Sequence, residues 1–538
     1  MAPKLTQPEA ILTAIVAIYL ALAVAYASTI PKWNAPDEPS HYNYVKHIAQ
    51  ERELPVLEPG DYDFDYLEKL KAAKFPDGMP IDSIRYESHQ PPLYYLLATP
   101  LFWATAALQV NSQVITLRLL SALFGALTIL VGYRTLRLAF GRDTLVPVAA
   151  AAFIASVPMY IHLTAAINND SLANLLLSLV LLAGVSLLAQ SAPVGTPEMP
   201  RRGVSTEVDA VASAHFRADR PPPYGLMDTS ATNRPVDALP IREGESEYPL
   251  SLCERERGGV RDWLTKLLTR EYVLFGGLLG LNLLTKTTAS VAVVLVAFVV
   301  LVHEFRVRAL RKRSGFVHIL ARGALRLTRI YAVALAISGW WFVRNAWVYG
   351  NMDIFGLKRH DTVVVGQPLT GPFDLSAARH FVTVSFQSFW AQFGWMGILV
   401  DQRIYLLLWG LCALAGLGFA LYLARVLFGK SSITNVYSAG PVPSQEQATS
   451  LQKWTLGLLA LCLVSLTAGV IQYNLTYIQA QGRYFFPAIV PIATFFVLGI
   501  REIVSPRYSG LAFLLLFCGM FFFDLMALLR FILPALAS

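Results

Sequence analysis

Long apolar segments recur along most of this 538-residue chain, and they limit its fold more than any other feature. The first runs from Ile11 to Ile30, and the last ends near Phe531. A helix of about 20 residues crosses roughly 30 Å of hydrocarbon and satisfies its own backbone hydrogen bonds there. We therefore predict an all-α polytopic membrane protein.

The composition argues against a soluble globular protein. The chain is 55% hydrophobic and 15% charged, and its mean hydropathy is +0.49, which is more apolar than a water-exposed fold tolerates. The net charge of +8 could indicate nucleic-acid binding, but the basic residues lie between the apolar segments, where they set membrane orientation. The four cysteines are scattered, so the sequence predicts neither a disulfide framework nor a cysteine metal site.

Eleven apolar segments are predicted to span the plasma or inner membrane as helices. With the N-terminus in the cytoplasm, the basic residues near positions 134–142, 306–313, 425–430 and 501–507 all lie on the cytoplasmic side. The odd number of spans then places the C-terminus outside. The predicted spans are residues 11–30, 116–136, 145–166, 170–189, 271–285, 288–304, 327–345, 404–424, 454–473, 485–500 and 509–531.

Residues 91–110 form one further apolar segment that is long enough to cross the bilayer. As a span it would move Arg134, Arg137 and Arg142 to the outside, against the preference of basic residues for the cytoplasm. We therefore predict that this segment is an interfacial helix along the outer membrane surface.

The predicted spans form two membrane regions, residues 1–190 and 271–538. Each region contributes a long external segment, 31–90 in the first and 346–403 in the second. Because polar side chains that can carry chemistry gather in and beside these segments, we expect the functional site on the outer face.

Two cytoplasmic segments, 191–265 and 430–452, are rich in Pro, Ser, Gly, Glu and Arg and lack periodic apolar residues. Such a composition buries too little apolar surface to offset the entropy lost on ordering. We predict that both segments are disordered and that neither takes part in catalysis.

Adjacent carboxylates, Asp37 and Glu38, follow directly after the first predicted span. A carboxylate at the membrane surface is partly desolvated, which makes it a better proton acceptor, and a second acid or a divalent cation can tune it. Asp37 is therefore our candidate base, and the adjacent Glu38 is a second candidate catalytic residue. The structural alternative is that both residues only cap a helix that starts near Pro39.

The first external segment ends with Glu87 and His89, just before the paired prolines Pro91 and Pro92. Prolines stop an extended segment, and the tyrosines after them suit the headgroup region, so both polar residues are expected at membrane level. His89 could bind substrate or a carboxylate, or it could be a solvated loop residue.

Further polar residues are expected on the same face at the ends of distant spans. Asp170 follows two asparagines in a short break that could also be a simple capped turn. Lys286, Arg344 and Arg483, the last followed by Tyr484, place positive charge outside, where any one of them could merely anchor a helix.

Together these residues suit sugar transfer from a lipid phosphate. A polyprenyl phosphate leaves with its negative charge, which Arg and Lys stabilise by charge-assisted hydrogen bonds, so no general acid is needed. One base and one cationic site fit a single displacement at the anomeric carbon with inversion.

Several short motifs occur in one order on this face: Pro36-Asp37-Glu38-Pro39, His89-Gln90-Pro91-Pro92-Leu93-Tyr94-Tyr95 and Asn169-Asp170. In this order they resemble the GT-C superfamily of lipid-linked-sugar transferases, which includes protein O-mannosyltransferases and lipid A aminoarabinose transferases. The motifs Trp341-Phe342-Val343-Arg344-Asn345 and Gln481-Gly482-Arg483-Tyr484 are similar to its bacterial DUF2142 branch.

The resemblance implies a GT-C-like bundle, with Asp37 and Asp170 as the acids of two external loops and with cationic residues at a phosphate site. It implies a polyprenyl-phosphate-linked donor and a glycan, lipid or protein acceptor. Some relatives have an acid or lysine just before the prolines, where this chain has His89 and Gln90. A divalent cation such as Mg²⁺ or Mn²⁺, if the reaction uses one, is expected on Asp37 with Glu87 or His89.

Two other classes of function stay open. A transporter or flippase places ionisable groups near the midplane of broken helices and often has repeated halves. Asp524, inside the last apolar segment, fits that class, but the sequence shows no inverted repeat. A noncatalytic scaffold for envelope assembly is the third class, and the intact acids and cations argue against it.

Overall fold

The computed structural model describes residues 6–141, 143–190, 270–309, 315–366, 374–428 and 445–537. These residues belong to one of the two units into which the chain divides, Met1–Val194 with Leu267–Ser538. The described part is helical apart from one short hairpin, in which Gln392 pairs with Leu399 and Phe393 with Ile398.

The first membrane region consists of helices and short connections. Its elements are α1 (Gln7–Thr29), α2 (Glu38–Glu51), α3 (Phe64–Ala72), η1 (Tyr86–His89), α4 (Leu93–Ala104), α5 (Val110–Phe140), α6 (Leu145–Ala155), α7 (Pro158–Thr164) and α8 (Asp170–Gln190). Residues 31–90, expected as a long external segment, thus contain two α-helices and a 3-10 helix.

The second membrane region contains the remaining helices and the hairpin. Its elements are α10 (Arg270–Leu283), η2 (Thr287–Ser290), α11 (Val291–Ala309), α12 (Phe316–Tyr349), α13 (Leu357–Val363), α14 (Leu375–Trp390), β1 (Gln392–Phe393), β2 (Ile398–Leu399), α15 (Gln402–Phe428), α16 (Gln445–Asn474), η3 (Gly482–Ala488), α17 (Ile489–Ile503), α18 (Ser509–Met526), η4 (Ala527–Ile532) and α19 (Leu533–Ala537).

The predicted all-α membrane class is confirmed, but the count of eleven spans is not. All eleven predicted ranges overlap helices. Among the described residues, seven helices are long and apolar enough to cross a membrane, or eight if α6 and α7 count as one span bent by 64°. Pro158 opens α7, and the missing proline N–H explains the break between the two helices.

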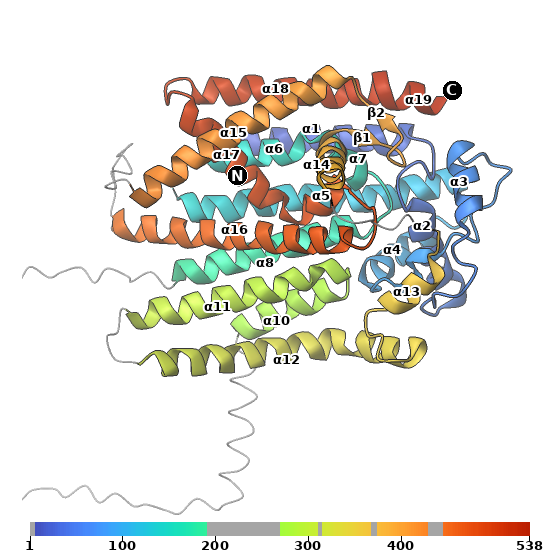
Figure 1. Cartoon of the computed structure of the whole chain (residues 1–538), viewed down its shortest axis with the longest axis horizontal. Coiled ribbons are helices and arrows are strands. Elements are labelled where there is room, and N and C mark those ends of the chain that lie inside the picture. Colours follow the sequence, from blue (N-terminus) through green and yellow to red (C-terminus); the bar gives the residue numbers. More distant parts are fainter. Residues whose placement is uncertain are drawn as a thin grey trace, which may run out of the picture. The chain divides into compact units, whose positions relative to one another are not determined.

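Long helices lie side by side along one direction, and the smaller helices gather at one end (Figure 1). α15 and α17 cross so closely that a Cβ on Gly418 would lie 2.0 Å from the carbonyl oxygen of Gly499. Small residues permit such close crossings between membrane helices. α2, α3, α4 and α13 lie together at the end that we interpret as external (Figure 1).

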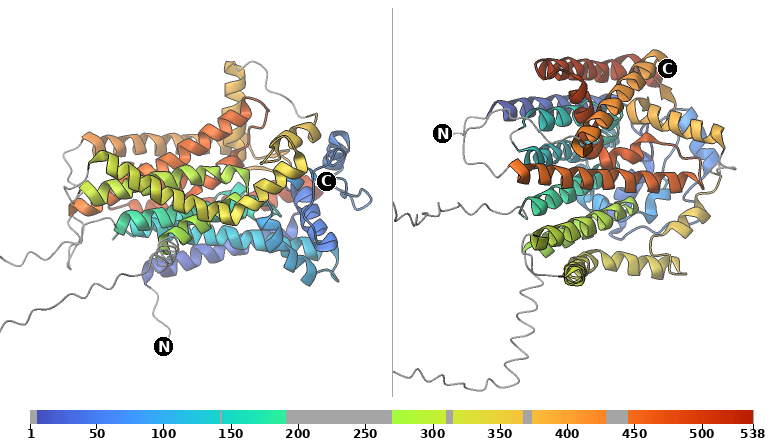
Figure 2. Two further views of the ribbon diagram at one scale, coloured as in Figure 1. Left: turned by 90° about the horizontal axis from the view of Figure 1, so that it is seen from below. Right: turned by 60° about the vertical axis from the view of Figure 1, so that its left-hand side comes forward.

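α14 runs in a different direction from the long helices. Figure 1 shows it end-on, and the left view of Figure 2 shows it projecting sideways from the bundle. Its first residue, Leu375, is 86% exposed, whereas Ser388 and Trp390 at its other end are buried. One end of α14 is therefore fixed to the bundle and the other extends away from it.

The structure also bears on the predicted interfacial segment and on the segments predicted to be disordered. The predicted interfacial segment 91–110 contains α4, a 12-residue helix that is shorter than a span. Residues 191–265 lie outside the described part of the chain, as do residues 430–444. α16 begins at Gln445, so the end of the segment predicted to be disordered, 445–452, is helical.

Candidate active site

Asp37 lies directly before α2, at the end of the bundle where the smaller helices gather, and two partners hold its carboxylate. Tyr86 donates its hydroxyl to Oδ1 of Asp37 at 2.7 Å. Nη2 of Arg483 lies 2.6 Å from Oδ2, and the Asp37 side chain keeps 18% of its surface exposed. The φ angle of Asp37 is +65°, a left-handed conformation that Asp adopts more readily than most residues. Asp37 is thus fixed in place but still accessible.

Glu38 has a different environment from its neighbour. Its side chain is fully buried, and Arg118, 2% exposed, forms an ion pair with it at 2.7 Å. The carboxylate also accepts the backbone N–H groups of Trp33 and Ile167 at 2.9 and 3.2 Å. Arg118 in turn donates to carbonyl groups at the end of α1, including that of Ile30 at 2.7 Å. Glu38 therefore serves the fold, which corrects the prediction that it is catalytic.

Asp37 and two side chains near it could together hold a metal ion. One ligand atom each from Asp37, His41 and Glu87 lie within 4.8 Å of one another. His41 lies in the first turn of α2, four residues after Asp37, and its backbone N–H donates to the carbonyl group of Asp37 at 3.1 Å. Nδ1 of His41 also lies 2.8 Å from the hydroxyl of Tyr95. The candidate metal ligands are thus two carboxylates and one imidazole.

A second ion pair lies across the site. Lys286, between α10 and η2, donates to Oδ1 of Asp170 at the start of α8. The two side chains are 16% and 17% exposed. Backbone contacts explain the position of Lys286, because Leu284 accepts the N–H of Leu93 at 2.9 Å, and Thr285 accepts from the side chain of Asn169 at 3.2 Å.

The pKa values of the external acids differ strongly although the residues are neighbours. For Asp37, burial favours the neutral form, but Arg483, His41 and the Tyr86 hydrogen bond outweigh it and lower the pKa to about 2. Burial and the negative charge of Asp37 raise the pKa of Glu87 to about 7, although Lys286 and Arg483 oppose that shift. The same interactions show that acids from three separate elements share one electrostatic environment.

The histidines near the site stay neutral at physiological pH. Burial lowers the pKa of His41 to about 4, although Asp37 opposes the shift. Burial and the neighbouring ring of His360 lower the pKa of His89 to about 3. The ring centres of His89 and His360 lie 4.7 Å apart, so His89 packs beside α13. The histidine that lies with Asp37 and Glu87 in the possible metal site is therefore His41, and not His89 as expected.

Arg344 and Tyr484 have separate roles in the geometry. Arg344 donates to the carbonyl groups of Leu54 and Pro55 at 3.1 and 2.8 Å, which ties α12 to the first external segment. These contacts correct the expectation that Arg344 lies with the other two cations. The guanidinium carbon of Arg483 lies 5.5 Å from the centre of the Tyr484 ring, so the two side chains form a cation–π contact at the site.

Sequence reasoning missed His41, Tyr86 and Arg118. The spacing of four residues between Asp37 and His41 on a predicted helix is the signal that could have identified His41. No local signal marks Tyr86 or Arg118, because their partners lie 49 and 80 residues away in the chain.

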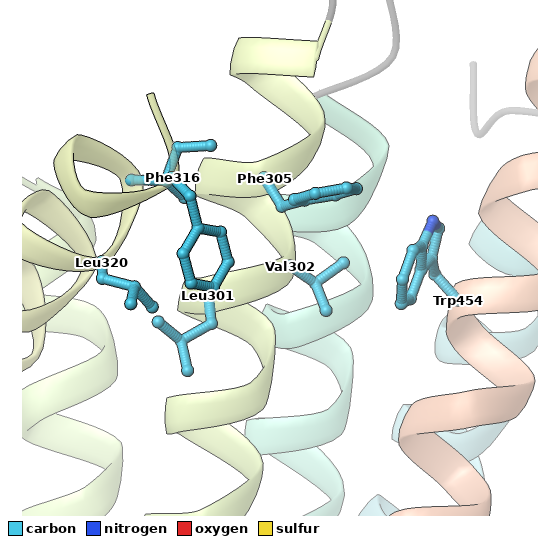
Figure 3. A pocket seen from close by; sticks show the side chains of 7 residues that line it. Leu301, Val302, Phe305, Phe316, Leu320 and Trp454 are labelled. Atoms are coloured by element: carbon cyan, nitrogen blue, oxygen red, sulfur yellow. The ribbon is translucent and has the colours of Figure 1, made fainter. Parts of the chain in front are cut away.

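An apolar groove at the other end of the long helices is separate from this site (Figure 3). Its volume is about 210 Å³. No acid or base lines it, so it does not add to the chemistry of the candidate site. The lining residues are Leu301, Val302, Phe305, Phe316, Ile319, Leu320 and Trp454.

No protein-family model matches the chain, and no curated protein matches it. Among solved structures, the chain is similar to ArnT from Cupriavidus metallidurans bound to undecaprenyl phosphate, with 14% identity, a TM-score of 0.44, and coverage of 98% of this chain and 73% of that chain. The apo oligosaccharyltransferase of Archaeoglobus fulgidus gives 11% identity, a TM-score of 0.45, and coverage of 98% and 55%.

The same archaeal enzyme in complex with Zn and sulfate gives 12% identity and a TM-score of 0.41, over 98% of this chain and 52% of that chain. This chain thus spans about half the length of the archaeal enzyme. Because all three TM-scores lie below 0.5, the proposals that follow rest on the residues of this chain.

Proposed function

We propose that the protein is an inverting glycosyltransferase that moves a sugar from a polyprenyl-phosphate donor to an acceptor at the outer membrane face. One observation carries the proposal: an acid directly before α2 and acids from η1 and α8 gather at one end of the membrane helices with cations from two distant segments. The ion pairs of Asp37 with Arg483 and of Asp170 with Lys286 are the core of that group.

Asp37 is the base in this reaction. The acceptor hydroxyl gives its proton to the carboxylate of Asp37 while the acceptor oxygen forms a bond to the anomeric carbon. The bond from that carbon to the phosphate oxygen breaks, and its electron pair stays on the phosphate. Attack and departure on opposite faces of the sugar invert the anomeric configuration.

The positive side chains bind the donor and stabilise the leaving group. A phosphate already carries negative charge in the ground state and gains more as the glycosidic bond breaks, so cations stabilise the transition state most. Arg483 and Lys286 are only 10% and 16% exposed. Charge interactions are stronger there than in bulk water.

A divalent cation fits the three residues Asp37, His41 and Glu87 better as Mn²⁺ than as Mg²⁺. The ligand atoms lie within 4.8 Å of one another, and one of them is an imidazole nitrogen. Mg²⁺ prefers oxygen ligands, whereas Mn²⁺ also accepts imidazole. Such an ion would supply positive charge beside the leaving phosphate. Asp37, His41 and Glu87 are the residues that would hold it.

The proposed family is the GT-C superfamily, in its DUF2142 branch, with a place in the cell envelope. In this assignment the N-terminus lies in the cytoplasm and the C-terminus outside. The acceptor is a glycan, a lipid or a protein. The short motifs around Asp37, Asp170 and Arg483 support the assignment.

The test is a transfer assay with purified protein and a panel of radiolabelled polyprenyl-phosphate sugars. We expect Asp37→Asn to reduce turnover by about 10²-fold or more, the usual contribution of a general base. Asp82→Asn is the matched control, because Asp82 forms an exposed ion pair with Lys46 at 2.6 Å in the same external region. Full turnover by Asp37→Asn would reject Asp37 as the base.

Transport is a second candidate because of Asp524 in α18. This carboxyl is fully buried, and neither of its oxygens has a hydrogen-bond partner within the described part of the chain. Its backbone carbonyl accepts the hydroxyl of Tyr26 at 2.8 Å. A buried acid in a membrane helix is a common feature of transport pathways. The clustered charges at the external end nevertheless favour the transferase.

A further inference from the structure

Arg483 has two roles in the proposed reaction that conflict in the structure. It is the cation expected to bind the donor phosphate, yet its Nη2 lies 2.6 Å from Oδ2 of Asp37. The other oxygen of Asp37 accepts the hydroxyl of Tyr86 at 2.7 Å. Both oxygens of the base are therefore engaged before any substrate binds, and the strongest partner is the phosphate-binding group itself.

The guanidinium of Arg483 also has a free donor. Its Nε is buried, and it has no hydrogen-bond partner among the residues that the structure describes. The side chain as a whole is nine-tenths buried, with 10% of its surface exposed. A buried N–H without an acceptor costs free energy. An incoming anion would remove that cost, because a guanidinium binds phosphate through two parallel N–H groups.

We propose that the donor phosphate displaces Asp37 from Arg483, so that binding of the donor releases the base that the acceptor then uses. This inference rests on the proposed transferase function and adds an order of events to it. The donor binds first, and Asp37 becomes available only in the complex. In the resting protein, Asp37 occupies the phosphate site.

The surroundings of both residues permit this exchange. Gly482, next to Arg483, donates its N–H to the hydroxyl of Ser388 at 2.7 Å, and a Cβ on Gly482 would lie 2.0 Å from the backbone nitrogen of Phe389. The backbone of Arg483 is therefore fixed against α14, and only its side chain has to move. Asp37 keeps the Tyr86 hydrogen bond after the exchange, so the released carboxylate stays in position.

The test measures binding of a short-chain polyprenyl phosphate to purified protein in detergent at pH 8. If Asp37 competes with the phosphate for Arg483, Asp37→Asn binds the probe about tenfold more tightly than wild type, because one charge-assisted hydrogen bond need not be broken. Arg483→Gln is expected to lose most of the binding. Thermal unfolding shows that each variant is folded.

Glu87→Gln distinguishes displacement of Asp37 from Arg483 from the simpler effect of removing a negative charge near the phosphate. Glu87 is an acid of the same site, and Arg483 forms its ion pair with Asp37 and not with Glu87. Removing its charge lowers repulsion of the phosphate without releasing Arg483. Displacement therefore requires a clearly larger gain in affinity for Asp37→Asn than for Glu87→Gln. Asp82→Asn, which removes a distant ion pair, should change nothing.

Equal gains for Asp37→Asn and Glu87→Gln would overturn the displacement, and so would an unchanged or weaker affinity of Asp37→Asn. If Asp37→Asn does not fold, Asp37→Gly provides the same comparison, because glycine tolerates the left-handed backbone at this position. The transfer assay separates the two proposals. If Asp37→Asn loses turnover but does not bind the probe more tightly, only the displacement is rejected. If Asp37→Asn keeps full turnover, the assignment of Asp37 as the base is rejected.

Discussion

At the scale of single residues, the adjacent acids Asp37 and Glu38 show what a sequence can and cannot predict. Consecutive residues of a helix start point in different directions, so only one of the two could face the site. Which one does so depends on Arg118, which lies 80 residues away and ion-pairs with Glu38 at 2.7 Å. The sequence thus predicts a functional acid here, and the fold selects Asp37.

The buried pair of Glu38 and Arg118 predicts a large effect on stability. Arg118→Met leaves Glu38 without its counter-charge at a fully buried position, and loss of one partner of such a pair costs about 3 to 5 kcal/mol. Chemical unfolding in detergent measures the loss. Adding Glu38→Gln should restore part of the stability, because the unpaired charge is then gone. A double variant less stable than Arg118→Met would contradict this explanation.

Glu87 predicts how stability depends on pH. Its pKa rises from an ordinary value of 4.5 to about 7 in the folded protein. The folded state therefore holds a proton that the unfolded state has lost, and this stabilisation is present below pH 4.5 and disappears as the pH rises through 7.

Glu87→Gln removes that dependence. As the pH rises from 4.5 to 8, the free energy of unfolding of the variant minus that of wild type should increase by on the order of 2 kcal/mol. Thermal unfolding in EDTA at both pH values tests this, since a bound cation would favour ionised Glu87. The same difference between variant and wild type at both pH values would show that the carboxyl is not buried as described.

At the scale of elements, the apolar segments predict where helices occur, but they do not predict which helices contact one another. All eleven predicted ranges are helical, because a helix is the structure that satisfies the backbone in hydrocarbon. The contact of η3 with α14 could not be predicted, because it depends on Gly482, which donates its N–H to the hydroxyl of Ser388, 94 residues away in the chain. Pairings between distant segments depend on tertiary packing, which no local pattern encodes.

That contact predicts the effect of one methyl group. In Gly482→Ala, the new Cβ would lie 2.0 Å from the nitrogen of Phe389, so η3 must move away from α14 and carry Arg483 with it. We expect weaker binding of polyprenyl phosphate and at least tenfold lower transfer. Gly510→Ala is the matched control, because a Cβ there meets no atom within 4 Å. Equal activity of both variants would exclude a role for this contact.

At the scale of the whole molecule, the site depends on bringing distant parts of the chain to one end of the bundle. Asp37, Asp170, Lys286 and Arg483 are spread over most of the sequence, and the sequence predicts their shared face from the alternation of spans. It does not predict their pairing. Arg344 lies on the same face, where it donates to the carbonyl groups of Leu54 and Pro55 and takes part in neither ion pair.

Labelling from outside the cell tests this orientation. We expect a cysteine introduced at Asp82, and another at Leu536 in α19, to react with a membrane-impermeant maleimide in intact cells, because both positions are proposed to be external. A cysteine at Gln7, at the start of α1, should react only after the cells are permeabilised. The reverse pattern would place the candidate site in the cytoplasm.

The left-handed backbone of Asp37, with φ at +65°, restricts which amino acids this position can hold. Glycine, asparagine and aspartate adopt that conformation more readily than most residues. Of these three, aspartate alone carries a negative charge. This dihedral angle therefore favours aspartate over other acidic side chains here, and substitution by alanine would disturb the chain path as well as the chemistry.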